Sequence, residues 1–194
     1  MRKRTAILIS GRGSNMTALI EAAEKPDYPA EIVGVFSNNP HAGGLEFART
    51  RNIPTAVIDH RNFASREDFD NALDQVLDGW RAEIVCLAGF LRLLTAPFVE
   101  KWAGRMINIH PSLLPAYKGL HTHERALADG ATVHGATVHF VTPELDAGKA
   151  ILKAQVPVKP GDTVDTLGAR VLAEEHRIYP LALAMLARGR VGFP

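Results

Sequence analysis

The chain has 194 residues, of which 46% are hydrophobic and 22% are charged, and its formal net charge is +1. These proportions are ordinary for a soluble globular protein, and the length predicts a single domain spanning residues 1–194. Because the charge is nearly balanced and no long basic run occurs, we expect no nucleic-acid partner.

The only cysteine, Cys86, lies within the apolar run EIVCLAGF. A lone cysteine forms no intramolecular disulfide, so a reducing compartment is expected, and we interpret Cys86 as a core residue. The apolar run after the basic start MRKR is too short for a signal peptide, and no stretch approaches the roughly 18 apolar residues of a membrane span. We therefore expect a cytoplasmic protein with no membrane partner.

Short apolar runs alternate with amphipathic stretches from the start of the chain onward. We expect strands at 5–10, 31–37, 55–59, 83–90 and 106–110. These runs are nearly all apolar rather than alternating, which is typical of a parallel sheet buried on both faces. The alternation of strand and helix predicts a Rossmann-like α/β fold, with a mostly parallel twisted sheet and helices on both faces.

One helix is predicted with particular clarity between the third and fourth strands. Ser65 is placed as its N-cap, and apolar residues then recur at helical spacing. These apolar residues are Phe69, Leu73, Val76, Leu77 and Trp80.

The alternation of predicted strands and helices ends after residue 130. Two longer strands are expected at 132–142 and 151–159 with no helix between them, which predicts an antiparallel extension of the sheet. A long terminal helix follows, from about Thr163 to about Arg188. The residues expected on its apolar side are Leu167, Val171, Leu172 and Leu181.

The segment LISGRGSNM follows the first strand and opens a helix. Gly11 and Gly13 permit a tight turn, while Ser14 and Asn15 stand at a helix N-terminus, where free N–H groups favour an anion. A dinucleotide fingerprint would have a third glycine where Met16 stands and an acidic residue within SNNP. We therefore expect a single phosphate rather than NAD, with a plain strand-to-helix turn as the alternative.

The strand MINIH carries two polar residues, Asn108 and His110, at its carboxyl end. Residues two apart on a strand share a face, and ligands of parallel sheets bind beyond the carboxyl ends of the strands. An amide N–H and an imidazolium N–H aimed at one point could stabilise an oxyanion. The alternative is a hydrogen-bonded core asparagine followed by a capping histidine.

The segment TPELDAG places Glu144 and Asp146 between the last two strands. From spacing alone, Asp146 before Ala-Gly is better explained as a turn-forming residue. A catalytic interpretation requires that this loop fold back onto His110, because a carboxylate beside the imidazole would keep it protonated.

Other polar residues carry weaker signals. Glu175 lies in EEHRIYP on the last helix, where pattern alone favours an exposed charge. No cysteine cluster or His-Glu-x-x-His helix accompanies the remaining histidines, so we expect no metal site. The histidines considered as ligands are His121, His123, His134 and His139.

Six segments stand in an order and spacing that resemble the phosphoribosylglycinamide formyltransferases, a family of formyltetrahydrofolate-dependent formyltransferases. The segments are GRGSN, VFSNNP, LAGFLRLL, NIHPSLLPAYKGLHTHERAL, HGATVHFVTPELDAG and EEHRIYP. The resemblance covers nearly the whole chain. It implies that an amine of phosphoribosylglycinamide attacks the formyl carbon of 10-formyltetrahydrofolate, a cosubstrate, in a step of purine biosynthesis that needs no metal.

The resemblance also implies a role for individual residues. The catalytic set comprises Asn108, His110 and Asp146. The ribotide contacts are Gly13, Ser14, Asn15 and Glu175. The folate contacts are Arg66, Leu91, Arg92, Leu93, Leu94, Asn108, Thr142, Pro143, Glu144, Leu145 and Asp146.

Two departures and two alternatives accompany the resemblance. Lys149 stands where relatives commonly have proline, and Leu172 stands where they often carry a longer polar side chain. The alternatives are a formyltetrahydrofolate hydrolase, or another formyl-transferring relative, and a non-catalytic module that binds phosphate or a nucleotide. We expect small-molecule substrates and a monomer or weak homodimer.

Overall fold

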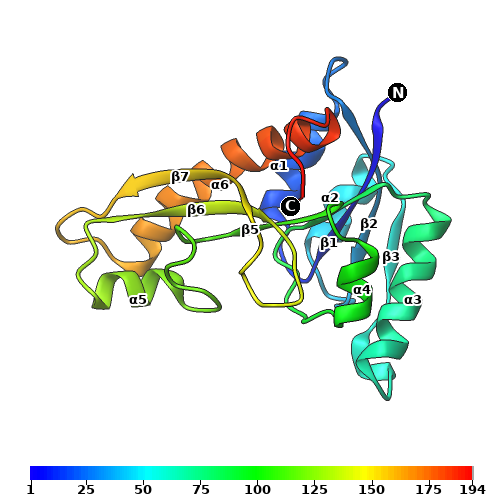
Figure 1. The fold of residues 1–194 in the computed structure, drawn as a ribbon, viewed down its shortest axis with the longest axis horizontal. Coiled ribbons are helices and arrows are strands. Elements are labelled where there is room, and N and C mark those ends of the chain that lie inside the picture. The colour runs from blue at the N-terminus through cyan, green and yellow to red at the C-terminus, as the bar shows by residue number, and fades with distance from the viewer. Residues whose placement is uncertain (194) are drawn as a thin grey trace.

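The computed structural model describes residues 1–193, and its strands form one seven-stranded sheet in the order β3-β2-β1-β4-β5-β6-β7 (Figure 1). The strands are β1 (Lys3–Ile9), β2 (Ala30–Ser37), β3 (Thr55–Val57), β4 (Ile84–Leu87), β5 (Met106–His110), β6 (Val133–Phe140) and β7 (Ala150–Pro157). Strands β1 to β5 pair in parallel, whereas β6 and β7 are antiparallel to their neighbours. The predicted parallel sheet with an antiparallel C-terminal extension is confirmed.

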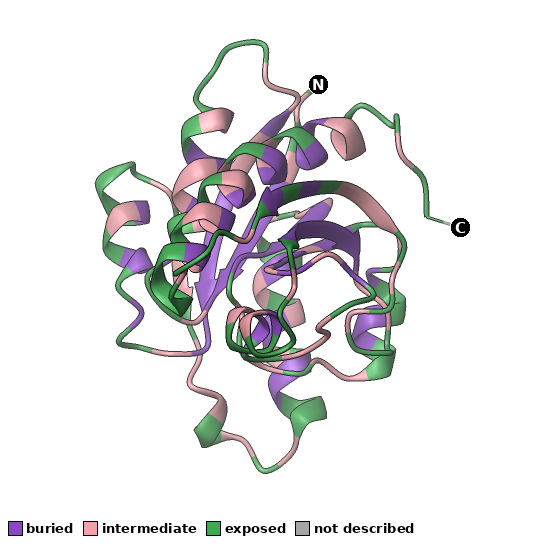
Figure 2. Ribbon diagram, turned by 90° about the vertical axis from the view of Figure 1, so that its left-hand side faces the viewer, coloured by how far each residue is buried: buried purple, intermediate pink, exposed green. Residues whose placement is uncertain are grey.

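Helices cover both faces of this sheet. They are α1 (Ser14–Ala23), α2 (Gly44–Thr50), α3 (Arg66–Gly79), α4 (Ala96–Lys101), α5 (Thr122–Ala128) and α6 (Val164–Ala187), with a short 3-10 turn η1 (His60–Asn62). Alternate residues of β1 point to opposite faces, so Ile7 packs with α1, α2 and α6 while Leu8 packs with α3 and α4. Figure 2 shows the buried strands in purple at the centre, with exposed helix surfaces outside.

The helix caps follow the sequence closely. The Ser65 hydroxyl accepts a hydrogen bond from the Asp68 amide at 3.0 Å and begins α3, as predicted. Thr163 caps α6 by accepting from the Thr166 amide at 3.2 Å. Such a cap typically contributes about 1 kcal/mol to stability.

Several details of the predicted elements are wrong. Strand β4 ends at Leu87 rather than at residue 90, because the chain turns at Gly89, whose φ of 73° is left-handed. Strands β3, β6 and β7 end at Val57, Phe140 and Pro157, each two residues before its predicted end. Leu181 is 49% exposed, because the buried stripe of α6 passes instead through Ile178, Ala182 and their neighbours.

The sheet brings the ends of several strands together. Leu87 of β4 lies opposite Asn108 of β5, and Asn108 lies opposite His139 of β6. The carboxyl end of β5 therefore has a loop from β4 on one side and an antiparallel strand on the other. Among residues 1–193, no helix is both long and apolar enough to cross a membrane.

Candidate active site

A cavity of about 790 Å³ opens at the carboxyl ends of β4 and β5. Segments far apart in the sequence line it, including the loop after β4, the end of β5, the loop between β6 and β7, and α6. Of the residues implicated by the sequence, those that line it are Asn15, Leu91, Arg92, Leu93, Leu94, Asn108, His110, Thr142, Pro143, Leu145, Asp146 and Glu175.

Four implicated residues do not line this cavity. Arg66 is exposed at the first turn of α3, and Glu144 is exposed and forms an ion pair with Lys118 at 3.2 Å. Ser14 faces a different cavity, and Gly13 is the residue before α1. Gly13 has a φ of 73°, and a Cβ placed there would lie 3.2 Å from the Cα of Gly44, so both the backbone angle and the close approach favour glycine.

His110 and Asp146 meet in this cavity although they come from different loops. Nδ1 of His110 lies 3.5 Å from Oδ2 of Asp146, and each side chain is only 7% exposed. Nε2 of His110 is 2.9 Å from the carbonyl oxygen of Tyr117. Since a carbonyl oxygen can only accept, Nε2 carries a proton, and Nδ1 is the nitrogen that faces the carboxylate.

The loop carrying Asp146 is both a turn and a wall of the site. Asp146 has a φ of 50°, as expected for a turn-forming residue, and its Oδ2 accepts a hydrogen bond from the Gly119 amide at 2.8 Å. The turn-forming interpretation is therefore confirmed, and the loop also folds back onto His110, which the catalytic interpretation requires. The hydrogen bond ties the β6–β7 loop to the turn that follows β5.

His139 orients the amide of Asn108. Nδ1 of His139 donates to the carbonyl of Phe140 at 2.9 Å, and burial lowers the pKa of the His139 imidazole, which favours its neutral form. Its Nε2 is then an acceptor, and it lies 3.3 Å from Nδ2 of Asn108. The amide nitrogen of Asn108 thus points toward His139 and keeps a second N–H for a ligand.

The sequence had suggested His139 only as a possible metal ligand. Its position opposite Asn108 depends on the register of β5 with β6. The alternation of VHFV in β6 was the available signal, but only the register shows which side chain faces Asn108. Oδ1 of Asp146 also lies 3.7 Å from Nε2 of His139, so the two histidines flank one carboxylate.

Glu175 also lines the cavity and is only 6% exposed, so the exposed charge favoured by pattern is wrong. Asn15 donates to its Oε2 at 2.7 Å. Burial raises the pKa of Glu175, while the hydrogen bond from Asn15 opposes this increase. Oδ1 of Asn15 has no hydrogen-bond partner within residues 1–193, so this pair retains an acceptor for a ligand.

Two further histidines, His123 and His134, contact each other at 3.1 Å between Nδ1 and Nε2. Burial lowers the pKa of His134 to about 4 and also lowers that of His123. Among residues 1–193, no group of three His, Cys, Asp or Glu side chains is arranged to hold a metal ion.

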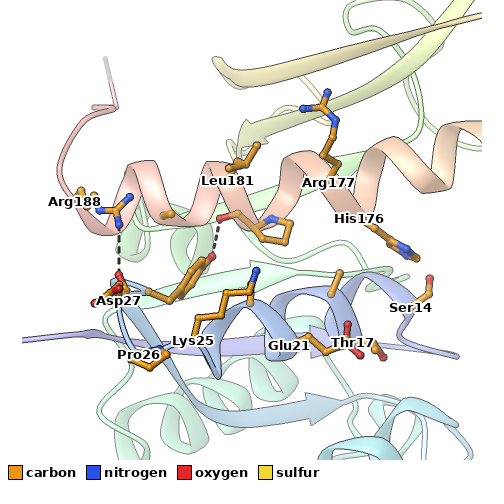
Figure 3. A pocket seen from close by; sticks show the side chains of 15 residues that line it. Ser14, Thr17, Glu21, Lys25, Pro26, Asp27, His176, Arg177, Leu181 and Arg188 are labelled. Atoms are coloured by element: carbon orange, nitrogen blue, oxygen red, sulfur yellow. Dashed lines mark hydrogen bonds between the residues drawn. The ribbon is translucent and has the colours of Figure 1, made fainter.

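A separate cavity of about 870 Å³ lies between α1 and α6. Figure 3 shows Ser14 and His176 at one end of it and Asp27 and Arg188 at the other. None of Asn108, His110 and Asp146 lines this cavity, so the polar set described above belongs to the cavity at the strand ends.

Comparisons of this chain with a family profile and with curated proteins all point to the same family. The formyl transferase family profile matches residues 3–183. The chain is 52% identical over 190 residues to the human trifunctional purine biosynthetic protein adenosine-3, covering 98% of this chain but only 19% of that protein. It is 49% identical over 185 residues to phosphoribosylglycinamide formyltransferase of Escherichia coli K12, covering 95% of this chain and 87% of that protein.

Solved structures agree with this result. The phosphoribosylglycinamide formyltransferase of Coxiella burnetii superposes with a TM-score of 0.96 at 47% identity, covering 100% of this chain and 91% of that one. That of Brucella melitensis gives a TM-score of 0.93 at 51% identity, with 100% of both chains covered. The likeness therefore extends over the complete sheet and its helices.

Proposed function

Because the chain belongs to the formyl transferase family, we propose that it transfers the formyl group of 10-formyltetrahydrofolate to the amine of phosphoribosylglycinamide. The products are formyl-phosphoribosylglycinamide and tetrahydrofolate, a step of purine biosynthesis. The observation that carries the proposal is the convergence of Asn108, His110 and Asp146 in one cavity. Relatives that bear this activity in their names support it.

The cavity offers separate places for the two substrates. The folate lies against Leu91 to Leu94 and the loop from Thr142 to Asp146, most of whose side chains face the cavity. The ribotide lies toward Asn15 and Glu175, where buried polar atoms suit ribose hydroxyls. Its phosphate extends beyond this cavity to Gly13 and Ser14, where the first amides of α1 favour an anion. Arg66 and Glu144 act at the outer end of the folate.

The reaction requires stabilisation of the negative charge that develops on the formyl oxygen. Attack by the amine makes the formyl carbon tetrahedral and places negative charge on that oxygen. The free N–H of Asn108 donates to it, and Nδ1–H of a protonated His110 does the same. Nε2 of His110 is held by the Tyr117 carbonyl, so Nδ1 is the nitrogen available to the reacting atoms.

Protons must also move during the transfer. The attacking amine loses a proton, the bond between the formyl carbon and the folate nitrogen breaks, and that nitrogen gains a proton. Asp146 faces Nδ1 of His110 at 3.5 Å, and its negative charge stabilises the imidazolium. Holding both substrates in one cavity contributes further, because correctly oriented reactants lose little entropy on reaction.

A two-substrate assay tests the proposal. The purified chain is mixed with 10-formyltetrahydrofolate, with and without phosphoribosylglycinamide, and tetrahydrofolate, formate and formylated ribotide are measured. We expect formylated ribotide and tetrahydrofolate in equal amounts, and little formate when the acceptor is omitted. Rapid release of formate without the acceptor would indicate a hydrolase instead.

We infer further that residues 1–194 act as one domain, as a monomer or weak homodimer, in the cytoplasm. The buried thiol of Cys86 is compatible with a reducing compartment. Sedimentation over a range of concentrations would measure the oligomeric state, and a tight dimer at micromolar concentration would contradict the inference.

A further inference from the structure

The segment from Ala88 to Thr95, which we call the 88–95 segment, forms one wall of the cavity without regular secondary structure. It begins where β4 ends and reaches α4. Two of its side chains, Leu91 and Leu93, are 75% and 55% exposed. Phe90 and Leu94 pack against the buried core, but Leu91 and Leu93 do not. The shape of the part between them therefore depends largely on polar contacts.

Two side chains from outside the segment hold its backbone. The Leu91 amide donates to the hydroxyl of Ser10 at 2.8 Å, and the Thr95 amide donates to Oδ2 of Asp70 at 2.7 Å. Within residues 1–193, these are the only amides between 90 and 95 that donate a hydrogen bond. One anchor comes from the end of β1 and the other from α3.

The Ser10 hydroxyl is itself oriented by its surroundings. It donates its proton to Oδ1 of Asn38 at 2.6 Å, so its lone pairs remain for the Leu91 amide. Asn38 is only 4% exposed and also contacts Nδ1 of His60 at 3.3 Å. Asn38 belongs to the VFSNNP motif, for which the proposed reaction gives no other use.

The burial of Asp70 is energetically unfavourable, and the packing around it does not explain why it is kept. It is only 2% exposed, and its Oδ1 has no hydrogen-bond partner within residues 1–193. A buried carboxyl oxygen without a hydrogen-bond partner is destabilising, so its retention calls for an explanation. The neighbouring Phe69 ring lies 4.6 Å from the guanidinium carbon of Arg92, so this turn of α3 contacts the segment twice.

We propose that Ser10 and Asp70 are positioning residues that hold the 88–95 segment in the shape that binds the folate cosubstrate. The inference rests on the proposed function, because that function places the folate against this segment. Preorganising the segment lowers the entropy lost when the ligand binds. Loss of either anchor is expected to weaken folate binding while leaving the ribotide side unchanged.

The test compares Ser10→Ala and Asp70→Ala with Asp70→Asn, which keeps an oxygen acceptor for the Thr95 amide. Thr163→Ala is the matched control, because it also removes a hydroxyl that accepts a backbone amide, but at the start of α6. The KM of each substrate, kcat and Tm are measured for every variant.

We expect the KM for 10-formyltetrahydrofolate to rise about fivefold in Ser10→Ala and Asp70→Ala, the usual effect of one hydrogen bond. The KM for phosphoribosylglycinamide should stay within about twofold, and Asp70→Asn should resemble the wild type. Thr163→Ala should lower Tm without changing either KM. An unchanged folate KM in Ser10→Ala, or an equal rise in both KM values, would overturn the inference.

Amide hydrogen exchange provides a readout that does not depend on turnover. Without ligands, Ser10→Ala should exchange faster than the wild type in peptides covering 88–95, and Thr163→Ala should not. If Asp70→Ala does not fold, the result for Ser10→Ala alone decides whether the 88–95 segment is anchored as proposed. A wild-type chain without formyl transfer would refute the proposed function, whereas unchanged exchange in Ser10→Ala would refute the anchoring role.

Discussion

Replacing Asp146 with asparagine removes one negative charge and nearly preserves shape. The side-chain oxygen of the new amide can still accept the hydrogen bond that Gly119 donates at 2.8 Å. The β6–β7 loop should therefore keep its position. What is lost is the attraction between the carboxylate and a protonated His110, across 3.5 Å.

The size of this loss follows from the distance. Two unit charges 3.5 Å apart attract each other by about 4–5 kcal/mol at an effective dielectric constant of about 20. Part of that attraction already exists before the amine attacks, so only a fraction lowers the barrier. Taking about half, or about 2 kcal/mol, predicts that kcat falls about 30-fold.

Steady-state kinetics with both substrates tests this expectation. The KM of each substrate should remain within about twofold of the wild type, because the cavity keeps its shape. Asp162→Asn is the control, since it neutralises a carboxylate whose side chain is 5% exposed but which pairs with Arg170 away from the cavity. A kcat for Asp146→Asn within about threefold of the wild type would refute the assigned role.

Three further outcomes are expected. Asn108→Ala should lower kcat by about 100- to 1,000-fold, the usual effect of losing one oxyanion donor, and a loss below tenfold in the same assay would contradict its role. Glu175→Gln should raise the KM for phosphoribosylglycinamide by about tenfold without changing that for folate, because it alters a polar pair at the ribotide end. Chemical denaturation should show the free energy of unfolding falling as pH drops from about 6.5 to about 4. His134 in the unfolded chain binds a proton near its ordinary pKa of 6.5, whereas burial in the folded chain lowers that pKa to about 4. The difference corresponds to about 3 kcal/mol, so His134→Gln should flatten this part of the profile, and an unchanged slope would contradict the burial argument.

Much of the fold was predictable because local signals agreed with the global pattern. The run MINIH is strand β5 with the bounds expected, Ser65 caps α3 as predicted, and the last helix begins where expected, beside Thr163. The shared face of Asn108 and His110 also follows from strand geometry. These features depend on residues close together in the sequence.

The contacts that complete the site depend on residues far apart in the sequence. Asp146 meets His110 only because the β6–β7 loop folds onto the turn after β5. His139 reaches Asn108 through strand register, and Ser10 reaches the Leu91 amide across 81 positions. Glu175 was misjudged for the same reason, since its burial depends on Asn15 and the facing helix α1.

A crystal structure of the chain with phosphoribosylglycinamide and an unreactive analogue of 10-formyltetrahydrofolate tests the central claim most directly. The formyl oxygen should lie about 2.7–3.2 Å from Nδ2 of Asn108 and within the same range of Nδ1 of His110. The attacking amine should lie beside the formyl carbon, with Asp146 at most one water molecule from the imidazole. A formyl group bound away from Asn108 and His110 while both ligands occupy the cavity would contradict the account.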